Sequence, residues 1–425
     1  MSQLNRRTFV KLAGSAAVLS LAGTPWLARA GTKARVVVVG GGYSGAIAAK
    51  YLRMADPGID VTLVEKNSKF ISCPSSNEVL AGDRTIDSLT FGYDGLKGHG
   101  VKVVHGEVEA IDAANKQVKV KGGDALKYDY AVVAPGIDFK WEAIDGYDEA
   151  AAELMPHAWK AGPQTLLLRK QLEAMPDGGV VFISAPPNPF RCPPGPYERA
   201  AQIAHYLKQH KPKSKVMVLD HKTKFSKQGL FTAGWKQAYG DMISWVSGAE
   251  DGKVMAVDAK KGLLITDFSE HKADVANIIP PQRAGAVATR SGLVDDSGWC
   301  PVDQRTFESS LHKDVFVIGD SCIAGAMPKS AYAANSQGKV CAAMIAARVN
   351  GREEPEPSYV NTCYSIVTPD YGISVAAVYQ YKDGKIVAVE GASGVSPSDA
   401  SPEIRKREAV YQRSWFNNIT ADMFT

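Results

Sequence analysis

The chain of 425 residues has few of the residue types and patterns that mark several large classes of function. It holds only six cysteines and eight histidines. Neither a C-x-x-C nor a C-x-x-C-H motif occurs, which argues against a thioredoxin-like site and against an attached c-type haem. No spacing of cysteines or histidines indicates an iron–sulfur cluster or a metal centre, so we predict no metal. A net charge of +4 without a long basic run predicts no nucleic-acid partner.

Long apolar runs are also scarce. After residue 30 no run of about 18 apolar residues occurs, so we predict no stable membrane insertion. The apolar content of 45% and the charged content of 22% are typical of an ordinary globular protein. The length predicts two or three domains.

The first thirty residues form a different kind of segment. Arg6 and Arg7 precede an apolar stretch over residues 12–27, and Ala28-Arg29-Ala30 follows it. This order of charged region, apolar region and Ala-x-Ala site is typical of a cleaved export signal, and the arginine pair resembles a twin-arginine signal. We therefore predict a periplasmic protein that is exported after it has folded around its cofactor. A short membrane anchor is the alternative reading of the same residues.

A glycine-rich turn follows the β-branched run of residues 34–39. Gly40, Gly42 and Gly45 form a G-x-G-x-x-G pattern between a predicted strand and a predicted helix. In this pattern Gly40 makes the tight turn, Gly42 lets the backbone approach a pyrophosphate, and Gly45 lets the helix pack on the strand. Glu65 ends the next predicted strand, where an acidic side chain accepts hydrogen bonds from ribose hydroxyls. These residues predict a dinucleotide site.

Three later segments resemble, in order, the landmarks of flavoproteins with two dinucleotide domains. Residues 101–112 would lie beside the adenine, residues 128–136 near the pyrophosphate, and residues 315–320 end in a Gly-Asp pair whose carboxylate would accept from the ribityl chain. This order predicts FAD as the cofactor. The predicted cofactor-binding residues are Gly40, Gly42, Gly45, Glu65, Lys66, Val108, Gly136 and Asp320, to which the cysteine and lysine discussed below are added.

A second β-α-β unit is expected over residues 178–220, where relatives bind NAD(P)H. Its loop, residues 185–196, is rich in proline and has no G-x-G-x-x-G pattern. Prolines lack the N–H groups that would hold a phosphate, and they cannot adopt a positive φ. We therefore predict that no NAD(P)H binds here and that the electrons come from another donor.

Together these patterns predict an α/β protein with two Rossmann-like dinucleotide-binding domains, of the disulfide reductase type, plus a C-terminal α+β capping domain. The predicted division is residues 1–30 for the signal, 32–140 and 285–350 for a discontinuous FAD-binding domain, 141–284 for the second Rossmann-like domain, and 351–425 for the capping and interface domain.

The six cysteines lie at positions 73, 192, 300, 322, 341 and 363. In an oxidising compartment they could form three structural disulfides, and the spacing does not select a pairing. A protein of this size does not need such cross-links. Cys341, on an apolar helix, is expected to be a buried thiol. Cys300 and Cys322 stay ambiguous between packing and contact with the cofactor.

The sequence around the other three cysteines resembles one family. Residues 73–78, 190–199, 327–330 with 334–338, and 361–364 resemble motifs of the flavoprotein subunit of flavocytochrome c sulfide dehydrogenase, and the resemblance covers nearly the whole mature length. It implies a thioether from Cys73 to the flavin, a redox-active disulfide between Cys192 and Cys363, and a separate c-type cytochrome subunit that completes a heterodimer.

The resemblance implies that hydrosulfide attacks the Cys192–Cys363 disulfide and that the electrons pass through FAD to the cytochrome. A disulfide offers such a nucleophile an electrophilic sulfur. Cys363 is the sulfur that we expect nearer the flavin. Lys329, at the start of a helix predicted over residues 328–346, could stabilise the charge of reduced flavin or could simply face solvent.

Two other functions fit the same residues. A sulfide:quinone oxidoreductase shares the fold and the disulfide, but residues 401–425 offer no long apolar face for a membrane. A flavoprotein accessory subunit of a thiosulfate-oxidising system is the second alternative.

Overall fold

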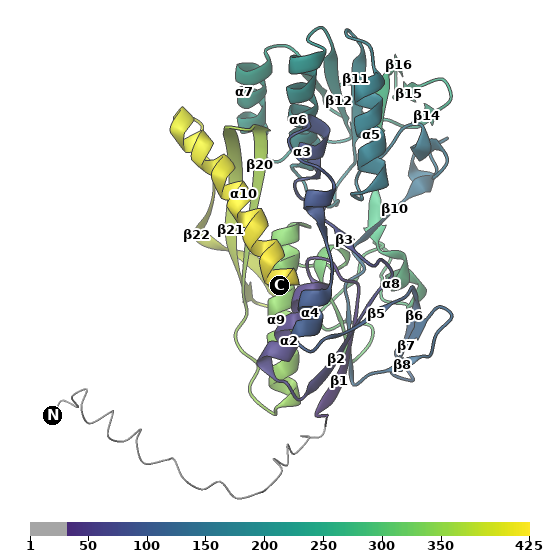
Figure 1. The fold of residues 1–425 in the computed structure, drawn as a ribbon, viewed down its shortest axis with the longest axis vertical. Coiled ribbons are helices and arrows are strands. Elements are labelled where there is room, and N and C mark those ends of the chain that lie inside the picture. Colours follow the sequence, from purple (N-terminus) through teal and green to yellow (C-terminus); the bar gives the residue numbers. More distant parts are fainter. Residues whose placement is uncertain (1–31) are drawn as a thin grey trace, which may run out of the picture. The chain divides into compact units, whose positions relative to one another are not determined.

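Five parallel strands form the first sheet of the computed structural model, which describes residues 32–425 (Figure 1). Strand β19 comes from late in the chain and pairs with β9, so residues 315–317 share a sheet with residues 34–39. The β-branched strand β1 is buried between two neighbours, as expected for a parallel sheet covered on both faces. In sheet order the strands are β19 (Val315–Val317), β9 (Tyr130–Val133), β1 (Ala34–Val39), β2 (Ile59–Glu65) and β5 (Lys102–His105).

Two helices and a small antiparallel sheet pack around this first sheet. Helix α2 (Gly45–Ala55) packs against α9 (Ala331–Val349). The sequence predicted that helix α9 begins at Pro328, but it begins at Ala331. Ser330 caps the helix there, because its side chain accepts a hydrogen bond from the Ala333 N–H. The other elements near this sheet are β3 (Phe70–Ile71), α3 (Ser76–Ala81), β4 (Thr90–Phe91), α4 (Asp94–Gly98), β6 (Val108–Asp112), β7 (Gln117–Val120), β8 (Leu126–Lys127) and α8 (Ala286–Arg290).

A second parallel sheet has the order β13-β12-β11-β17. Helix α6 carries Pro196 in its first turn, a position that tolerates proline because that N–H has no partner in the helix. The elements are β11 (Val180–Ala185), β12 (Lys215–Asp220), β13 (Ile243–Val246), β17 (Val275–Ile278), α5 (Pro163–Ala174), α6 (Gly195–His210) and α7 (Gln228–Tyr239), with the hairpins β14 (Ala256–Asp258), β15 (Leu263–Ile265), β16 (Glu270–Lys272) and the connecting pair β10 (Ile137–Phe139), β18 (Gln282–Ala284).

The last part of the chain is a three-stranded antiparallel sheet followed by a long helix. Strands β20 (Ser358–Thr368), β21 (Tyr371–Lys382) and β22 (Lys385–Val395) lie side by side, and α10 (Pro402–Phe424) packs against β20 and β21 (Figure 1). At the end of α10, Phe424 stacks on Phe91 with ring centroids 5.3 Å apart. Through this contact the C-terminal helix packs against the first Rossmann-like unit.

This architecture confirms the predicted fold class: two Rossmann-like units and a C-terminal α+β segment. Residues 32–425 cluster as one unit by contacts, so the boundaries proposed at residues 140, 285 and 351 stay predictions. The predicted signal, residues 1–30, lies outside the described residues.

Candidate active site

In the turn between β1 and α2, close packing of the protein itself requires glycine at some positions but not at others. A Cβ on Gly40, whose φ is +97°, would lie 2.4 Å from the Ala134 carbonyl oxygen, and a Cβ on Gly45 would lie 1.9 Å from the Gly40 oxygen. At Gly42 the nearest atom to such a Cβ is a Phe70 ring carbon at 3.7 Å. The fold requires glycine at positions 40 and 45, whereas position 42 is open on its outer side, as the approach of a pyrophosphate would require.

Glu65 holds this turn from the end of β2. Its Oε2 accepts a hydrogen bond from the Gly41 N–H at 2.8 Å, and its Oε1 accepts from the Asn67 N–H at 2.9 Å. Oε1 also accepts from the Asn67 side-chain amide at 3.0 Å, whereas Oε2 has the Gly41 N–H as its one partner among the described residues and keeps a lone pair that can accept from a ribose hydroxyl. Lys66 is exposed beside it.

Two other predicted cofactor residues lie on neighbouring elements. Val108 begins β6 and is buried, with its carbonyl accepting from Arg290 at 3.1 Å. Gly136 follows β9 with a φ of +67°, and its carbonyl accepts hydrogen bonds from the Ser321 hydroxyl and the Gly285 N–H.

Asp320 follows β19 and has an unsatisfied acceptor. Its Oδ1 is buried and has no hydrogen-bond partner. Burial raises the pKa of this carboxyl, and the charges of Arg191 and Lys329 oppose the shift. A buried polar atom without a partner is costly, and a hydroxyl of a bound ribityl chain would satisfy it. With the open face at Gly42, this orphaned oxygen makes the residues fit FAD.

Lys329 does not simply face solvent, which was the alternative considered from the sequence. Its ammonium donates to the Asp320 carbonyl at 2.7 Å and to the Cys322 carbonyl at 3.0 Å, and it lies 3.7 Å from the centre of the Trp299 ring. Burial lowers the pKa of this lysine. It lies before α9, not within it, and fixes the backbone on both sides of Ser321.

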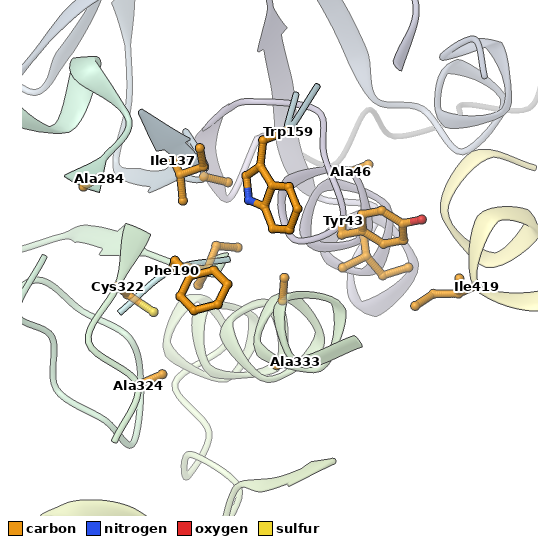
Figure 2. Close-up of a cluster of buried hydrophobic side chains, with 14 of the residues drawn as sticks. Tyr43, Ala46, Ile137, Trp159, Phe190, Ala284, Cys322, Ala324, Ala333 and Ile419 are labelled. Atoms are coloured by element: carbon orange, nitrogen blue, oxygen red, sulfur yellow. The ribbon is translucent and has the colours of Figure 1, made fainter. Parts of the chain in front are cut away.

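An apolar cluster lies next to these polar groups. Figure 2 shows Trp159 and Phe190 projecting into the same region as Tyr43 and Ala333, with Cys322 at its edge. The Trp159 and Phe190 rings have centroids 6.4 Å apart. The buried indole nitrogen of Trp159 has no hydrogen-bond partner, which makes it a second orphaned polar group in the region.

The three cysteines singled out from the sequence are the three that are partly exposed; the other three are buried. All six are thiols here. Cys73 lies between β3 and α3, and its sulfur contacts the Trp159 carbonyl at 3.6 Å and the Ala161 N–H at 3.5 Å. The neighbouring Arg191 guanidinium also donates to the Trp159 carbonyl. The tryptophan segment thus connects the Cys73 loop with the loop that carries Cys192.

Cys192 and Cys363 come together from distant parts of the chain. Cys192 has a φ of +58°, and its N–H donates to the Lys329 carbonyl at 2.7 Å. Burial raises the pKa of its thiol, and the nearby negative charges of Cys363 and Glu198 add to the shift. Cys363 lies in β20, where the Asn361 side-chain amide donates to its sulfur at 3.4 Å. The disulfide between them stays a prediction.

Sequence reasoning missed three charged residues around this pair. Glu198, on α6, accepts from the Ile366 N–H at 2.8 Å and from Asn77 at 2.9 Å, and burial raises its pKa. Lys227 donates to the Cys363 carbonyl at 2.9 Å. Arg199 is buried beneath the Trp159 ring. Glu198 and Arg199 lie in the motif around Cys192, so attention to that motif would have found them. Nothing near Lys227 in the sequence marks it.

Cys300 and Cys322 also lie side by side, on an isolated parallel bridge. Burial raises the pKa of each thiol to about 12, and the bridge places them beside Lys329. Cys341 is fully buried on α9, as expected of a structural thiol.

The second Rossmann-like unit has an acidic residue at the end of β12, but its carboxylate is occupied. Asp220 is fully buried and accepts hydrogen bonds from Tyr197 at 2.5 Å, Trp245 at 3.0 Å and Lys222 at 2.6 Å. Tyr197 also stacks on Phe225, with ring centroids 3.7 Å apart. The carboxylate that would serve a ribose in a nucleotide-binding unit is therefore committed to the core.

Three family models match separate parts of the chain. A model described as pyridine nucleotide-disulphide oxidoreductase matches residues 34–161. The model for the central part of the sulfide dehydrogenase [flavocytochrome c] flavoprotein chain matches residues 165–280, and the flavin-binding model of flavocytochrome c sulphide dehydrogenase matches residues 355–424. The chain belongs to the family of flavocytochrome c sulfide dehydrogenase flavoprotein chains.

The chain is similar to proteins of two kinds, a flavocytochrome c flavoprotein chain and sulfide:quinone oxidoreductases. A 49-residue sequence of the sulfide dehydrogenase [flavocytochrome c] flavoprotein chain from Chlorobaculum thiosulfatiphilum is 65% identical over its full length, which is 12% of this chain. Mouse mitochondrial sulfide:quinone oxidoreductase is 22% identical over 67% of this chain and 65% of its own length, just under two thirds. The solved structure of Aquifex aeolicus sulfide:quinone oxidoreductase superposes with a TM-score of 0.72 at 17% identity, covering 91% of this chain and 92% of that one.

The family models and these relatives support a bound flavin. Among the helices of residues 32–425, none is both long and apolar enough to cross a membrane.

Proposed function

We propose that this flavoprotein oxidises hydrosulfide at a disulfide between Cys192 and Cys363, with FAD as its cofactor. The observation that carries the proposal is the convergence of these two cysteines from the 186–194 loop and β20, beside residues that fit a flavin. When bound, FAD supplies an acceptor for the two electrons. The chain's own residues provide the electrophilic sulfur and the charges around it.

Charged side chains near Cys192 support this assignment. Glu198 has a pKa raised by burial and lies close enough for its charge to act on Cys192, so it is placed to take a proton from hydrogen sulfide. Lys227 and Arg191 bring positive charge to the same sulfur, which favours an anionic substrate.

We further propose that the electrons leave to a c-type cytochrome subunit in the periplasm, and that no NAD(P)H takes part. The family membership supports the cytochrome. The occupied Asp220 and the proline-rich loop support the exclusion of NAD(P)H. The quinone alternative keeps support from the sulfide:quinone oxidoreductases among the relatives.

A comparison of electron acceptors tests the function. Purified holoprotein is mixed with sulfide and either cytochrome c or decylubiquinone, and reduction of each acceptor is followed by absorbance. We expect sulfide-dependent reduction of cytochrome c at the higher rate. A higher rate with the quinone would support the quinone reductase, and no sulfide-dependent reduction of either would support the accessory role.

A covalent flavin is the second element of the proposal. Cys73 is partly exposed beside Trp159, and we expect its sulfur to hold the FAD as a thioether. The intact mass of denatured wild-type protein should then include one FAD, and the Cys73→Ser variant should lack it. Cys341→Ser, a change of a buried thiol on α9, is the matched control and should keep the FAD. Release of free FAD from denatured wild type would contradict the tether.

A further inference from the structure

In the described part of the chain, Lys227 is a partly buried cation whose ammonium donates to neutral oxygens. It precedes α7 in the left-handed region, with a φ of +59°, and its ammonium reaches across to the C-terminal sheet. Its donors go to the Cys363 carbonyl at 2.9 Å, the Ser365 hydroxyl at 2.8 Å and, at the limit of a hydrogen bond, the Ile373 carbonyl at 3.5 Å. Within residues 32–425 no carboxylate oxygen lies within 4.0 Å of this nitrogen.

The hydrogen-bond acceptors around the Lys227 ammonium carry no charge, and the carboxylates that act on it, Glu198 and Glu408, lie beyond 4.0 Å. Neutral oxygens satisfy the hydrogen-bonding capacity of an ammonium, but they do not repay the loss of its hydration. Burial accordingly lowers the pKa of Lys227 to about 8. The charges that oppose this shift are, in order, those of Cys363, Glu198, Cys192 and Glu408. The strongest candidate for a counterion is therefore a thiolate on Cys363.

The two cysteines differ in how well they can carry a negative charge. The sulfur of Cys363 receives a hydrogen bond from the Asn361 amide, whose own oxygen accepts from Ser330 and is fixed by it. The thiol of Cys192 has a pKa raised by burial and by the neighbouring charges of Cys363 and Glu198. Lys227 acts on both sulfurs, but its stronger partner is Cys363. The Asn361 amide and the Lys227 ammonium thus both favour a negative charge on Cys363.

We propose that Lys227 is the counterion of the thiolate that Cys363 carries once the disulfide opens, and that this pairing directs an entering nucleophile to the sulfur of Cys192. The inference rests on the proposed function, because it requires the Cys192–Cys363 disulfide. In the step, the sulfur of HS⁻ bonds to Cys192 Sγ while the disulfide bond breaks. Cys192 then carries a persulfide, S–SH, and Cys363 leaves as a thiolate. The entering sulfur is oxidised by two electrons as the disulfide is reduced, and the thiol with the lower pKa is the better leaving group.

Sulfite provides a probe that records which sulfur is attacked. It opens a disulfide by leaving S-sulfonate on the attacked cysteine and a thiolate on the other. Oxidised holoprotein is treated with sulfite, alkylated with iodoacetamide and examined by peptide mass spectrometry. We expect protein with S-sulfonate on Cys192 and alkylation on Cys363 to be roughly tenfold more abundant than protein with S-sulfonate on Cys363 and alkylation on Cys192. Lys227→Met should remove most of this preference, and Lys227→Arg should keep it.

A second measurement uses the reduced protein and does not require turnover. The rate of alkylation of each cysteine is followed against pH. Removing a nearby positive charge raises a thiol pKa by about one to three units, so the Cys363 midpoint should move upward in Lys227→Met. Lys224→Met, which changes an exposed lysine on the same loop, is the matched control and should leave both midpoints in place.

The outcomes separate this inference from the proposed function. An unchanged Cys363 midpoint in Lys227→Met, or a shift confined to Cys192, would overturn the role of Lys227. Sulfite attack mainly on Cys363 in wild type would overturn the direction of attack. If the oxidised wild type consumes no sulfite because it has no disulfide, the proposed function fails, while the alkylation profile still decides whether Lys227 pairs with Cys363.

Discussion

Replacing Cys192 with serine should lower the rate of sulfide-dependent flavin reduction by at least about a thousandfold, because an alcohol cannot form the disulfide with Cys363 that we propose as the target of hydrosulfide. Flavin binding should survive, since the residues that fit FAD lie on β1, β2 and β19 and on the loops that follow them. Stopped-flow absorbance of the flavin after mixing with sulfide measures the rate, and the absorbance spectrum before mixing reports retention of the flavin.

The matched control is Cys341→Ala, which removes a fully buried thiol on α9. It should reduce its flavin at close to the wild-type rate. Undiminished reduction in Cys192→Ser would exclude the disulfide mechanism. Loss of flavin from that variant would instead show that the loop carrying Cys192 is needed to hold the cofactor.

Replacing Arg199 with methionine should destabilise the folded protein by about 3 kcal/mol or more, because it leaves several buried acceptors without a donor. The guanidinium donates to side-chain oxygens of Asn77 and Asn277 at 3.0 and 2.9 Å, and to the carbonyls of His157 and Ala158 at 3.0 and 2.7 Å. Burial lowers the pKa of this arginine to about 10. Methionine relieves the buried charge but satisfies none of the four oxygens.

Thermal unfolding of the holoprotein measures this effect, and we expect a midpoint several degrees below that of wild type. Arg35→Met is the matched control: its ion pair with Asp129 is exposed, so the midpoint should barely move. Arg199→Lys should also be less stable than wild type, since an ammonium cannot reproduce the planar array of donors. A wild-type midpoint in Arg199→Met would contradict the structural role.

The parts of the site that were predictable are those whose chemistry is local in the sequence. Gly45 is required by the nearby Gly40 carbonyl within one strand-turn-helix unit, and the glycine pattern indicates this close packing directly. The contact that requires Gly40 comes from Ala134, after β9, but the tight turn at this position is still readable from the local pattern. The start of α9 was predicted wrongly because Pro328 suits a first turn, yet Ser330 provides the cap and was a readable signal.

Lys227 and Arg199 illustrate what local patterns leave out. Lys227 is a lysine in a loop, and only the folded chain brings it to the Cys363 carbonyl. Arg199 faces the protein interior because His157 and Ala158 present carbonyls to it from a separate loop. Charged side chains of this kind are indistinguishable from solvent-exposed ones until their distant partners are known.

The buried carboxylate of Asp220 has a consequence for coenzyme redesign. If no NAD(P)H takes part, as we propose, an attempt to make this chain accept electrons from a pyridine nucleotide would have to restore a glycine turn in the 186–194 loop. It would also have to free Asp220 from Tyr197 and Trp245. Removing a fully buried aromatic side chain such as Tyr197 costs about 3–5 kcal/mol. A grafted loop alone would therefore leave Asp220 bound to Tyr197 and Trp245, and the coenzyme would not bind. Freeing Asp220 as well would destabilise the fold, because in this half of the molecule the choice of electron donor and the hydrophobic core depend on the same side chains.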